Sequence, residues 1–432
     1  MQTDVLIIGG GPAGSTAAAL LARQGHRVSL IEKARHPRFH IGESLLPANL
    51  PLLETLGVAE EVRAIGMQKW GAEFISHWDG RQQDFRFIEA WNKSQPYAYH
   101  VRRSEFDRIL IRNAERAGAQ VIEDARVTAV DLGDGRAPAR IEVQPSQGEV
   151  QDWQARFVID ASGRDTFLAS RLEAKQRNPR HNSAAIFGHF RGAERNAGDR
   201  EGHISVYWFD HGWFWFIPLS DGATSIGAVV WPYYLKSRTC PVNEFLFNSI
   251  ALCPPLERRL RAAQLIGEAQ ATGNYSYSSS LTHGRNFLLI GDAFAFIDPV
   301  FSTGVMLAMQ NAFDAAAAVD TCLRHPARRR AALRQFDRVL RHGPRQFSWF
   351  IYRITSPTMR EMFMGPRNNL RMKEALLSLL AGDIFGATPI WGAIRAFKIT
   401  YSLLSLAHPR RTARAWRLRR VNVRPADAGA AP

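Results

Sequence analysis

The sequence predicts a mixed α/β fold, in which a nucleotide-binding region carries an inserted β-rich region and a mostly helical C-terminal part. A short apolar run at residues 4–8 leads into the glycine-rich turn GGGPAG at residues 9–14. Aromatic-rich, alternating segments lie between residues 67 and 280, and apolar residues recur at helical spacing after residue 305. With 432 residues, 46% of them hydrophobic, the chain can form two or three domains.

Residues 3–33 form the first recognisable unit. The apolar run at residues 4–8 is typical of a buried parallel strand, and residues 15–24 have a helical pattern that ends at Gly25. Residues 27–31 form a second apolar strand, directly followed by Glu32. Strand, glycine turn, helix, strand and acid, in this order, are typical of a dinucleotide-binding βαβ unit.

The glycines and the acid of this unit each have a physical task. Gly9 permits the tight turn, Gly11 lets the backbone approach a pyrophosphate, and Gly14 lets helix and strand pack closely. The helix N-terminus offers free N–H groups to phosphates, and a carboxylate at Glu32 can accept hydrogen bonds from ribose hydroxyls. The predicted contacts to the dinucleotide are Gly9, Gly11, Ala13, Gly14, Glu32 and Lys33.

The remaining segments define the expected domains. Residues 286–292 read as another buried strand ending in an acid, and residues 299–400 as mainly helical. We expect a discontinuous nucleotide-binding domain over residues 1–310, with β-rich insertions for substrate at about 67–100 and 175–280. Residues 311–432 are expected to form a helical C-terminal region with a basic tail.

Charge, cysteine spacing and hydrophobicity bear on whether the protein binds nucleic acid or metal or spans a membrane. The formal net charge is +15, and arginines gather at positions 410, 411, 414, 417, 419, 420 and 424. Such a cluster attracts nucleic acid, acidic lipid or an acidic protein, or forms a solvated helix face; no nucleic-acid-binding motif accompanies it. The three cysteines lack metal-ligand spacing, and no uncharged run is long enough to span a membrane. We expect a soluble, cytoplasmic protein with no bound metal.

Three segments extend the nucleotide-binding pattern. Residues 99–110 contain Arg103 and Asp107, residues 158–164 read VIDASGR, and Asp292 follows the strand and glycine turn near residue 290. Together they resemble the FAD-binding fold of aromatic hydroxylases, over about residues 1–310. The resemblance implies that Asp292 binds the ribityl chain of FAD and that the following helix points its positive end at the flavin, whereas Asp292 alone could be a helix cap. No second GxGxxG motif occurs, so we expect reduced flavin to come from a separate reductase or from transiently bound nicotinamide.

Three further motifs resemble those of flavin-dependent halogenases. They are GESLLP at residues 42–47, WFWFIP at residues 213–218 and FIDPVFSTG at residues 296–304. Lys69 lies between the first two motifs, where that family carries its catalytic lysine. The match indicates a shorter relative of the tryptophan halogenases, on a Rossmann-like FAD-binding fold.

The resemblance implies a two-component halogenase. Reduced FAD, O2 and chloride or bromide give hypohalous acid, which reaches Lys69 and halogenates an electron-rich aromatic ring. The implied FAD contacts outside the first unit are Gly42, Glu43, Ser44, Arg103, Asp292, Gly304 and Val305. The implied halide site is Ser302, Thr303 and Gly304. The implied wall between flavin and substrate is Trp213, Trp215, Ile217, Pro218, Phe296 and Pro299.

Other interpretations of these residues stay open. Lys69 could be an ordinary surface lysine, the two tryptophans could be core packing in a strand, and residues 42–44 could be a surface turn. At the level of function, the rivals are an FAD-dependent aromatic monooxygenase, a flavin reductase of the geranylgeranyl type, and a binding protein without turnover.

The sequence departs from the tryptophan halogenases at Phe301, where those enzymes carry a glutamate, and it is shorter. Both differences argue against free tryptophan and favour a phenol, pyrrole or indole, either free or bound to a carrier protein. Because carrier proteins are acidic, the basic C-terminal part is expected to attract one electrostatically.

Overall fold

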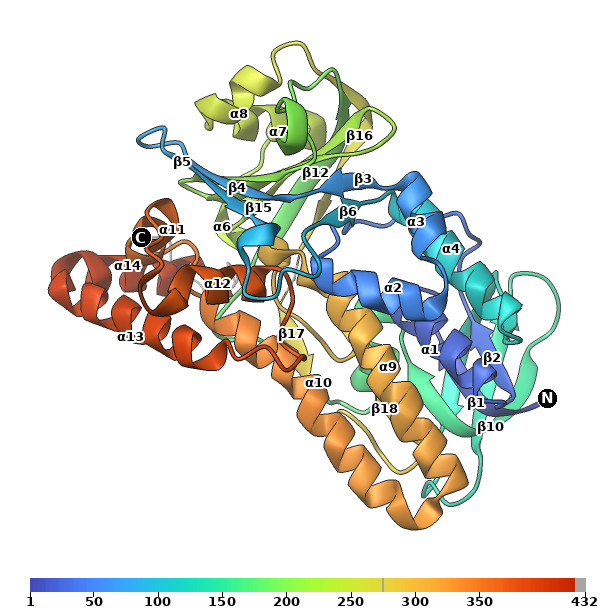
Figure 1. Cartoon of the computed structure of the whole chain (residues 1–432). Coiled ribbons are helices and arrows are strands. Elements are labelled where there is room, and N and C mark those ends of the chain that lie inside the picture. The colour runs from blue at the N-terminus through green and yellow to red at the C-terminus, as the bar shows by residue number, and fades with distance from the viewer. Residues whose placement is uncertain (274–275, 424–432) are drawn as a thin grey trace.

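The computed structural model describes residues 1–273 and 276–423. Two large sheets organise the chain (Figure 1). The first sheet has the strand order β7-β2-β1-β10-β9-β8, and β18 also pairs with β10. Its strands are β1 (Gln2–Ile8), β2 (Val28–Ile31), β7 (Gln120–Ile122), β8 (Ala125–Asp131), β9 (Ala139–Pro145), β10 (Gln151–Asp160) and β18 (Phe287–Leu289).

The parallel part of this sheet brings four strand ends to one edge. Ile8 at the end of β1 is in register with Ile31 of β2 and with Asp160 of β10, and Asp160 is in register with Leu289 of β18. Toward these ends the strands are buried and mostly apolar, as in residues 5–8 of β1 and 157–159 of β10, which is expected for a parallel sheet covered on both faces. The residues that follow these ends therefore share one edge, where ligands bind in open α/β sheets.

Helices from distant parts of the sequence cover the sheet. The alanine-rich α1 (Pro12–Arg23) packs against both α4 (Arg103–Arg116) and α9 (Thr303–Arg324), and α9 runs beside α10 (Arg329–Ile351) (Figure 1). Small side chains on α1 and α9 allow the close approach. The shorter helices α2 (Leu50–Leu56) and α3 (Ala59–Ile65) connect this layer to the second sheet.

The second sheet is built from strands in both regions expected to be insertions. Its strand order is β16-β12-β15-β14-β13-β4-β5, and all neighbours are antiparallel except β13 and β4. The strands are β4 (Gly71–Ser76), β5 (Gln82–Arg86), β12 (Ala184–Arg191), β13 (Ile204–Phe209), β14 (Gly212–Pro218), β15 (Ala223–Val230) and β16 (Gln264–Thr272). Helices α6 (Pro232–Lys236), α7 (Val242–Ala251) and α8 (Pro254–Arg259) follow β15.

Smaller pairings join the two sheets. β3 (Met67–Lys69) pairs with β6 (Ala98–His100), and β17 (Tyr277–Ser279) lies between β11 (Lys175–Arg177) and β19 (Ala295–Phe296). The one-turn α5 (Phe167–Arg171) follows the edge of the first sheet. These elements place Lys69 and residues 295–304 between the sheets.

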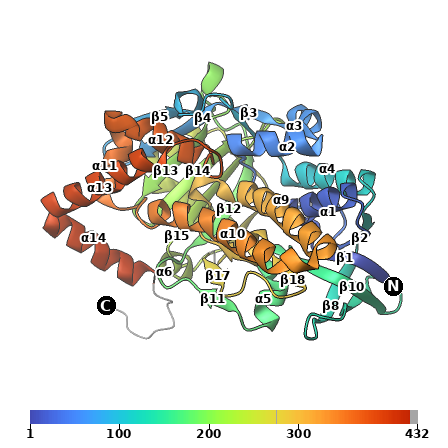
Figure 2. The same ribbon diagram turned by 60° about the horizontal axis from the view of Figure 1, so that its bottom comes forward.

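The C-terminal part is helical, as predicted. Its helices are α11 (Pro357–Met364), α12 (Met372–Leu380), α13 (Trp391–Ala407) and α14 (Pro409–Asn422). In both views α13 and α14 form the end of the molecule away from the first sheet (Figures 1 and 2). Six of the seven clustered arginines lie on α14, and Arg424 falls outside the described residues. Within the described part of the chain, no helix is long and apolar enough to cross a membrane.

Candidate functional site

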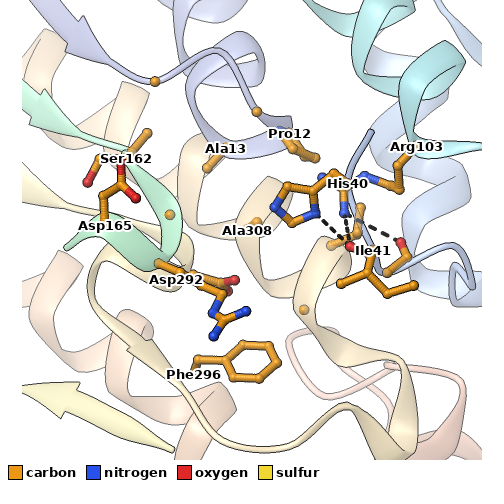
Figure 3. Close-up of a pocket in the computed structure, with 18 of the residues that line it drawn as sticks. Pro12, Ala13, His40, Ile41, Arg103, Ser162, Asp165, Asp292, Phe296 and Ala308 are labelled. Atoms are coloured by element: carbon orange, nitrogen blue, oxygen red, sulfur yellow. Dashed lines mark hydrogen bonds between the residues drawn. The ribbon is translucent and has the colours of Figure 1, made fainter. Parts of the chain in front are cut away.

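An elongated cavity of about 400 Å³ begins at the shared edge of the first sheet and extends toward the second sheet. Gly9, Glu32, Ala161 and Ile290, which follow β1, β2, β10 and β18, all line it. Figure 3 shows its wall, with Pro12 and Ala13 from α1, Arg103 from α4, and Asp292 and Phe296 around an open centre.

The glycine turn has the geometry that close backbone approach requires. Gly9 has a φ of +103°, and a Cβ there would lie 2.5 Å from the carbonyl oxygen of Ala161. A Cβ on Gly14 would lie 1.9 Å from the carbonyl oxygen of Gly9, so this glycine packs the helix against the turn rather than lining the cavity. A Cβ on Gly11 would meet only the Arg38 guanidinium, at 3.8 Å. Gly11 therefore leaves an open cradle that a side chain would fill.

Glu32 is buried at the end of β2 and is held in place by backbone donors. Its carboxylate accepts hydrogen bonds from the N–H groups of Gly10 at 2.6 Å and Ala34 at 2.9 Å. Arg38 lies 3.7 Å away. Lys33, half exposed on the cavity rim, forms an ion pair with Asp165.

The loop at residues 42–44 is clamped by α4. Arg103 donates to the carbonyl oxygen of Ile41 at 2.9 Å and to the Asp107 carboxylate at 2.8 Å. Gly42 has a φ of +107°, and all three loop residues line the cavity. Glu43 is buried, and one of its oxygens pairs with His189 at 2.8 Å. The hydrogen bonds of Arg103 to Ile41 and of Glu43 to His189 fix the loop as part of the cavity wall, so it is no surface turn.

Asp292 lines the cavity in the short turn Gly291–Ala293, and burial raises the pKa of its carboxyl to about 6. The helix expected directly after it begins later, at Thr303, because β19 and the turn Pro299–Phe301 come between. The N-terminus of α9 nevertheless reaches the cavity, where Gly304 and Val305 line it.

The residues predicted to bind halide face two different cavities. Ser302 has a φ of 56° and lines the cavity with Gly304, whereas Thr303 is buried and lines a smaller cavity beside α10. The N–H of Ser302 already donates to the carbonyl oxygen of Pro299 at 2.8 Å. The free donors at this point are therefore the N–H groups in the first turn of α9.

Strand β14 forms the far wall of the cavity. Because side chains alternate along a strand, Trp213, Trp215 and Ile217 face the cavity, while Phe214 and Phe216 lie in the core on the other face. The Trp215 indole N–H donates to Ser225 at 3.1 Å. Pro218, predicted as a wall residue, does not line the cavity. It is the last residue of the strand, and by the alternation of side chains it belongs to the other face. Phe296 and Pro299, from the loop before α9, do line it.

Lys69 is among the largest fully buried side chains of the described residues, with 2% of its surface exposed. Its ammonium donates to the Ser44 hydroxyl at 3.0 Å and to the carbonyl oxygen of Leu45 at 3.1 Å. Burial lowers the pKa of Lys69 to about 7. The interpretation as a surface lysine is therefore wrong. Lys69 does not line the large cavity itself; it lies behind Ser44, which does.

The sequence analysis missed several residues of this site. Arg38 and His40 line the cavity, and the charge of Arg103 lowers the pKa of His40 to about 4. His100 is fully buried; its Nε2 pairs with the carbonyl oxygen of Gly202 at 2.9 Å, and its Nδ1 has no hydrogen-bond partner in the described structure. The segment RHPRFH at residues 35–40, which Ile41 separates from GESLLP, was the available signal for Arg38 and His40.

Comparison with known proteins agrees with this geometry. A family model described as an FAD binding domain matches residues 2–337. A tryptophan 2-halogenase of Chondromyces crocatus is 38% identical over 327 residues, which span 74% of this chain and 62% of that protein. The chain thus covers less than two thirds of that relative.

Two further proteins match over most of their length. A 1H-pyrrole-2-carbonyl peptidyl-carrier-protein chlorinase of Pseudomonas fluorescens is 29% identical over 406 residues, 88% of this chain and 89% of that protein. The structure of the myxobacterial chondrochloren halogenase has a TM-score of 0.78 and 32% identity, and covers 90% of this chain and 92% of that one. The chain therefore belongs to the flavin-dependent halogenases, within the wider family of FAD-binding proteins.

Proposed function

We propose that this protein is a two-component halogenase that uses FADH2, O2 and chloride or bromide to halogenate an electron-rich aromatic ring. The observation that carries the proposal is the buried Lys69, whose ammonium contacts Ser44 on the wall of a cavity suited to FAD. A hydroxylase needs neither this lysine nor a double tryptophan wall.

The described residues fit FAD. The open cradle at Gly11 and the N-terminus of α1 suit the pyrophosphate, and Glu32 suits the ribose hydroxyls. The loop at residues 42–44, Arg103, Asp292 and the N-terminus of α9 would surround the rest of the cofactor. When bound and reduced, FAD supplies the chemistry that turns O2 and halide into hypohalous acid.

We assign the halide to the N-terminus of α9. The N–H groups of its first turn, together with the positive end of the helix dipole, favour an anion beside Ser302 and Gly304. Trp213 and Trp215 would keep the organic substrate away from the flavin and leave this end of the cavity to the small halide.

Lys69 would direct the electrophilic halogen. With a pKa near 7, a large share of its side chain is a neutral amine at physiological pH, able to accept halogen from hypohalous acid or to hydrogen-bond it. In the overall step the ring carbon forms a bond to the halogen and loses its proton, and the oxygen of hypohalous acid leaves as water. Ser44 stands between the cavity and this amine.

Phe301 is buried in the apolar cluster that contains Trp213 and Trp215 and supplies no carboxylate, which supports an uncharged, electron-rich substrate of the phenol, pyrrole or indole class. We infer that a separate flavin reductase supplies FADH2. We also infer that the substrate is carried by an acidic carrier protein, attracted by the six arginines of α14. The relative in Pseudomonas fluorescens acts on a carrier-bound pyrrole.

The test is mass spectrometry of a reconstituted reaction containing the protein, FAD, a flavin reductase, NADH, air, bromide and a panel of phenols, pyrroles and indoles. A bromine isotope doublet that is absent with K69A supports the proposal. Added oxygen without halogen would instead identify an aromatic monooxygenase. The carrier inference is tested separately, since it requires salt-sensitive association with an acidic carrier protein; association unaffected by salt, or none, contradicts it.

A further inference from the structure

A second, smaller cavity lies where the C-terminal helices meet the end of α10. Its volume is about 40 Å³, several times that of a water-sized void. Three guanidinium groups line it, those of Arg353, Arg411 and Arg419, together with Ser356 and Tyr401. No aspartate or glutamate among the described residues lines it. A partly open site with three cations and no acid suits an anion.

Arg353 lacks a counter-charge. Its Nη1 donates to the carbonyl oxygen of Trp349 at 2.9 Å, and its guanidinium lies 4.5 Å from the Trp349 ring centre. Its buried Nε has no hydrogen-bond partner within residues 1–273 and 276–423, and no carboxylate of that part forms an ion pair with it. A buried guanidinium donor without an acceptor is costly, and an anion in the cavity would satisfy it.

Arg419, on α14, is similarly placed. It donates to the carbonyl oxygens of Tyr352 and Arg180, and its Nη2 lies 3.2 Å from Nδ1 of His181. Burial, and then the neighbouring charge of Arg353, lower the pKa of Arg419 to about 10, and both side chains line the same cavity. An anion between them would reduce the repulsion between the two charges.

The surroundings favour an oxyanion. Ser356 caps α11 at this cavity by accepting from the N–H of Met359, so the positive end of that helix also faces the site. Serine and tyrosine hydroxyls can donate to oxygen, and guanidinium groups match the geometry of phosphate oxygens. Arg411 is already paired with Glu361 at 2.6 Å, which leaves Arg353 and Arg419 as the principal cations.

From these contacts we propose that the cavity between α10, α11 and α14 binds a phosphate group, held by Arg353 and Arg419. The group is either free phosphate or part of a small phosphate ester, such as the phosphopantetheine arm of a carrier protein. The site is distinct from the FAD cavity; binding of free phosphate does not depend on the proposed function, whereas binding of a carrier protein's phosphopantetheine rests on it.

The site also has a direct connection to the loop that precedes α9. His181, which contacts Arg419, pairs through its Nε2 with Asp298 at 2.8 Å. Asp298 accepts from the N–H of Val300 at 3.1 Å in the turn that leads to Ser302. A phosphate bound by Arg419 is therefore connected, through His181 and Asp298, to the turn that precedes the candidate halide site.

The experiment is isothermal titration of the full-length, FAD-loaded protein with inorganic phosphate and with 4′-phosphopantetheine, at constant ionic strength. Unphosphorylated pantetheine is the ligand control. We expect saturable binding of a phosphorylated ligand, at least tenfold weaker in R353Q and unchanged in R414Q, which removes an exposed arginine from α14.

Comparison of the two ligands identifies the source. Equal affinities indicate a site for free phosphate, and tenfold tighter binding of phosphopantetheine indicates the ester. Flavin absorbance and far-UV circular dichroism show whether R353Q is folded, and R353K, which keeps the charge, should retain part of the affinity. Absence of saturable binding, or equal weakening in R353Q and R414Q, overturns the proposal.

Discussion

The Lys69 ammonium lies 3.0 Å from the Ser44 hydroxyl, and this contact joins β3 to the loop at residues 42–44, 25 positions earlier in the sequence. Ser44 faces the large cavity, whereas Lys69 is buried behind it on β3. A reagent formed in the cavity therefore encounters Ser44 before it encounters the amine.

Replacement of Lys69 by alanine is expected to abolish halogenation and to leave FAD binding intact, because Lys69 does not line the cavity. Product formation falls at least a hundredfold, while hypohalous acid or peroxide is still released into solution. Mass spectrometry, a peroxide assay and flavin titration measure the three quantities. K93A, at an exposed lysine, is the matched control; wild-type rates in K69A would contradict the assignment.

The burial of Lys69 also predicts a pH-dependent stability. Its pKa is about 7 in the folded protein and about 10.5 when unfolded, so the unfolded chain binds the additional proton between these values. The destabilisation by this lysine is complete below pH 7 and disappears as the pH rises toward 10. Denaturant unfolding of the wild type and K69M should show a difference in free energy that changes by about 1.4 kcal/mol per pH unit in this window. A constant difference would exclude a lowered pKa.

Ser44 should control how well Lys69 is positioned. S44A removes one of the two acceptors of the ammonium, which costs about 1–2 kcal/mol of interaction and lowers halogenation roughly tenfold. S44T keeps the hydroxyl and should recover most of the rate. Product formed per hypohalous acid released is the informative measurement, because a purely structural effect would lower the amount of folded flavoprotein and leave this ratio unchanged.

Two glycines of the same turn should respond differently to substitution. G11V should fold normally but lose FAD, because its side chain enters the open cradle of the cavity. G14A should instead lower the free energy of unfolding by about 3 kcal/mol, because its Cβ would lie 1.9 Å from the Gly9 carbonyl oxygen. Flavin titration and thermal unfolding distinguish the two effects. Normal FAD binding by G11V would show that the cofactor lies elsewhere.

Local patterns were sufficient to predict the nucleotide-binding unit and the strand ends. The turn at Gly9, the acid at Glu32 and the strand before Asp292 are each encoded within a few neighbouring residues, and parallel pairing brings them to one edge. Strand alternation explains why Trp213 and Trp215 line the cavity together, whereas their expected role as a wall came from the family resemblance.

Other features depend on contacts between distant segments and could not be predicted in this way. The depth of Lys69 results from packing of β3 against β6 and the loop at Ser44, and Thr303 turns away because of the left-handed conformation at Ser302. The contact of Arg419 with His181 joins residues 238 positions apart. The amino-acid composition does not distinguish Arg419 from the other arginines of α14.

Strand β14 is packed on both faces. Trp213 and Trp215 line the large cavity on one face, and Phe214 and Phe216 lie in an apolar core on the other. Every residue of β14 is buried, so a change of side-chain size on either face disturbs packed neighbours rather than extending into solvent. Met359, Phe363 and Leu376, on α11 and α12, belong to the same apolar cluster as the two tryptophans but lie outside the two sheets. Substitutions at these helix positions can therefore alter the packing around Trp213 and Trp215 without changing the backbone pairing of β14 itself.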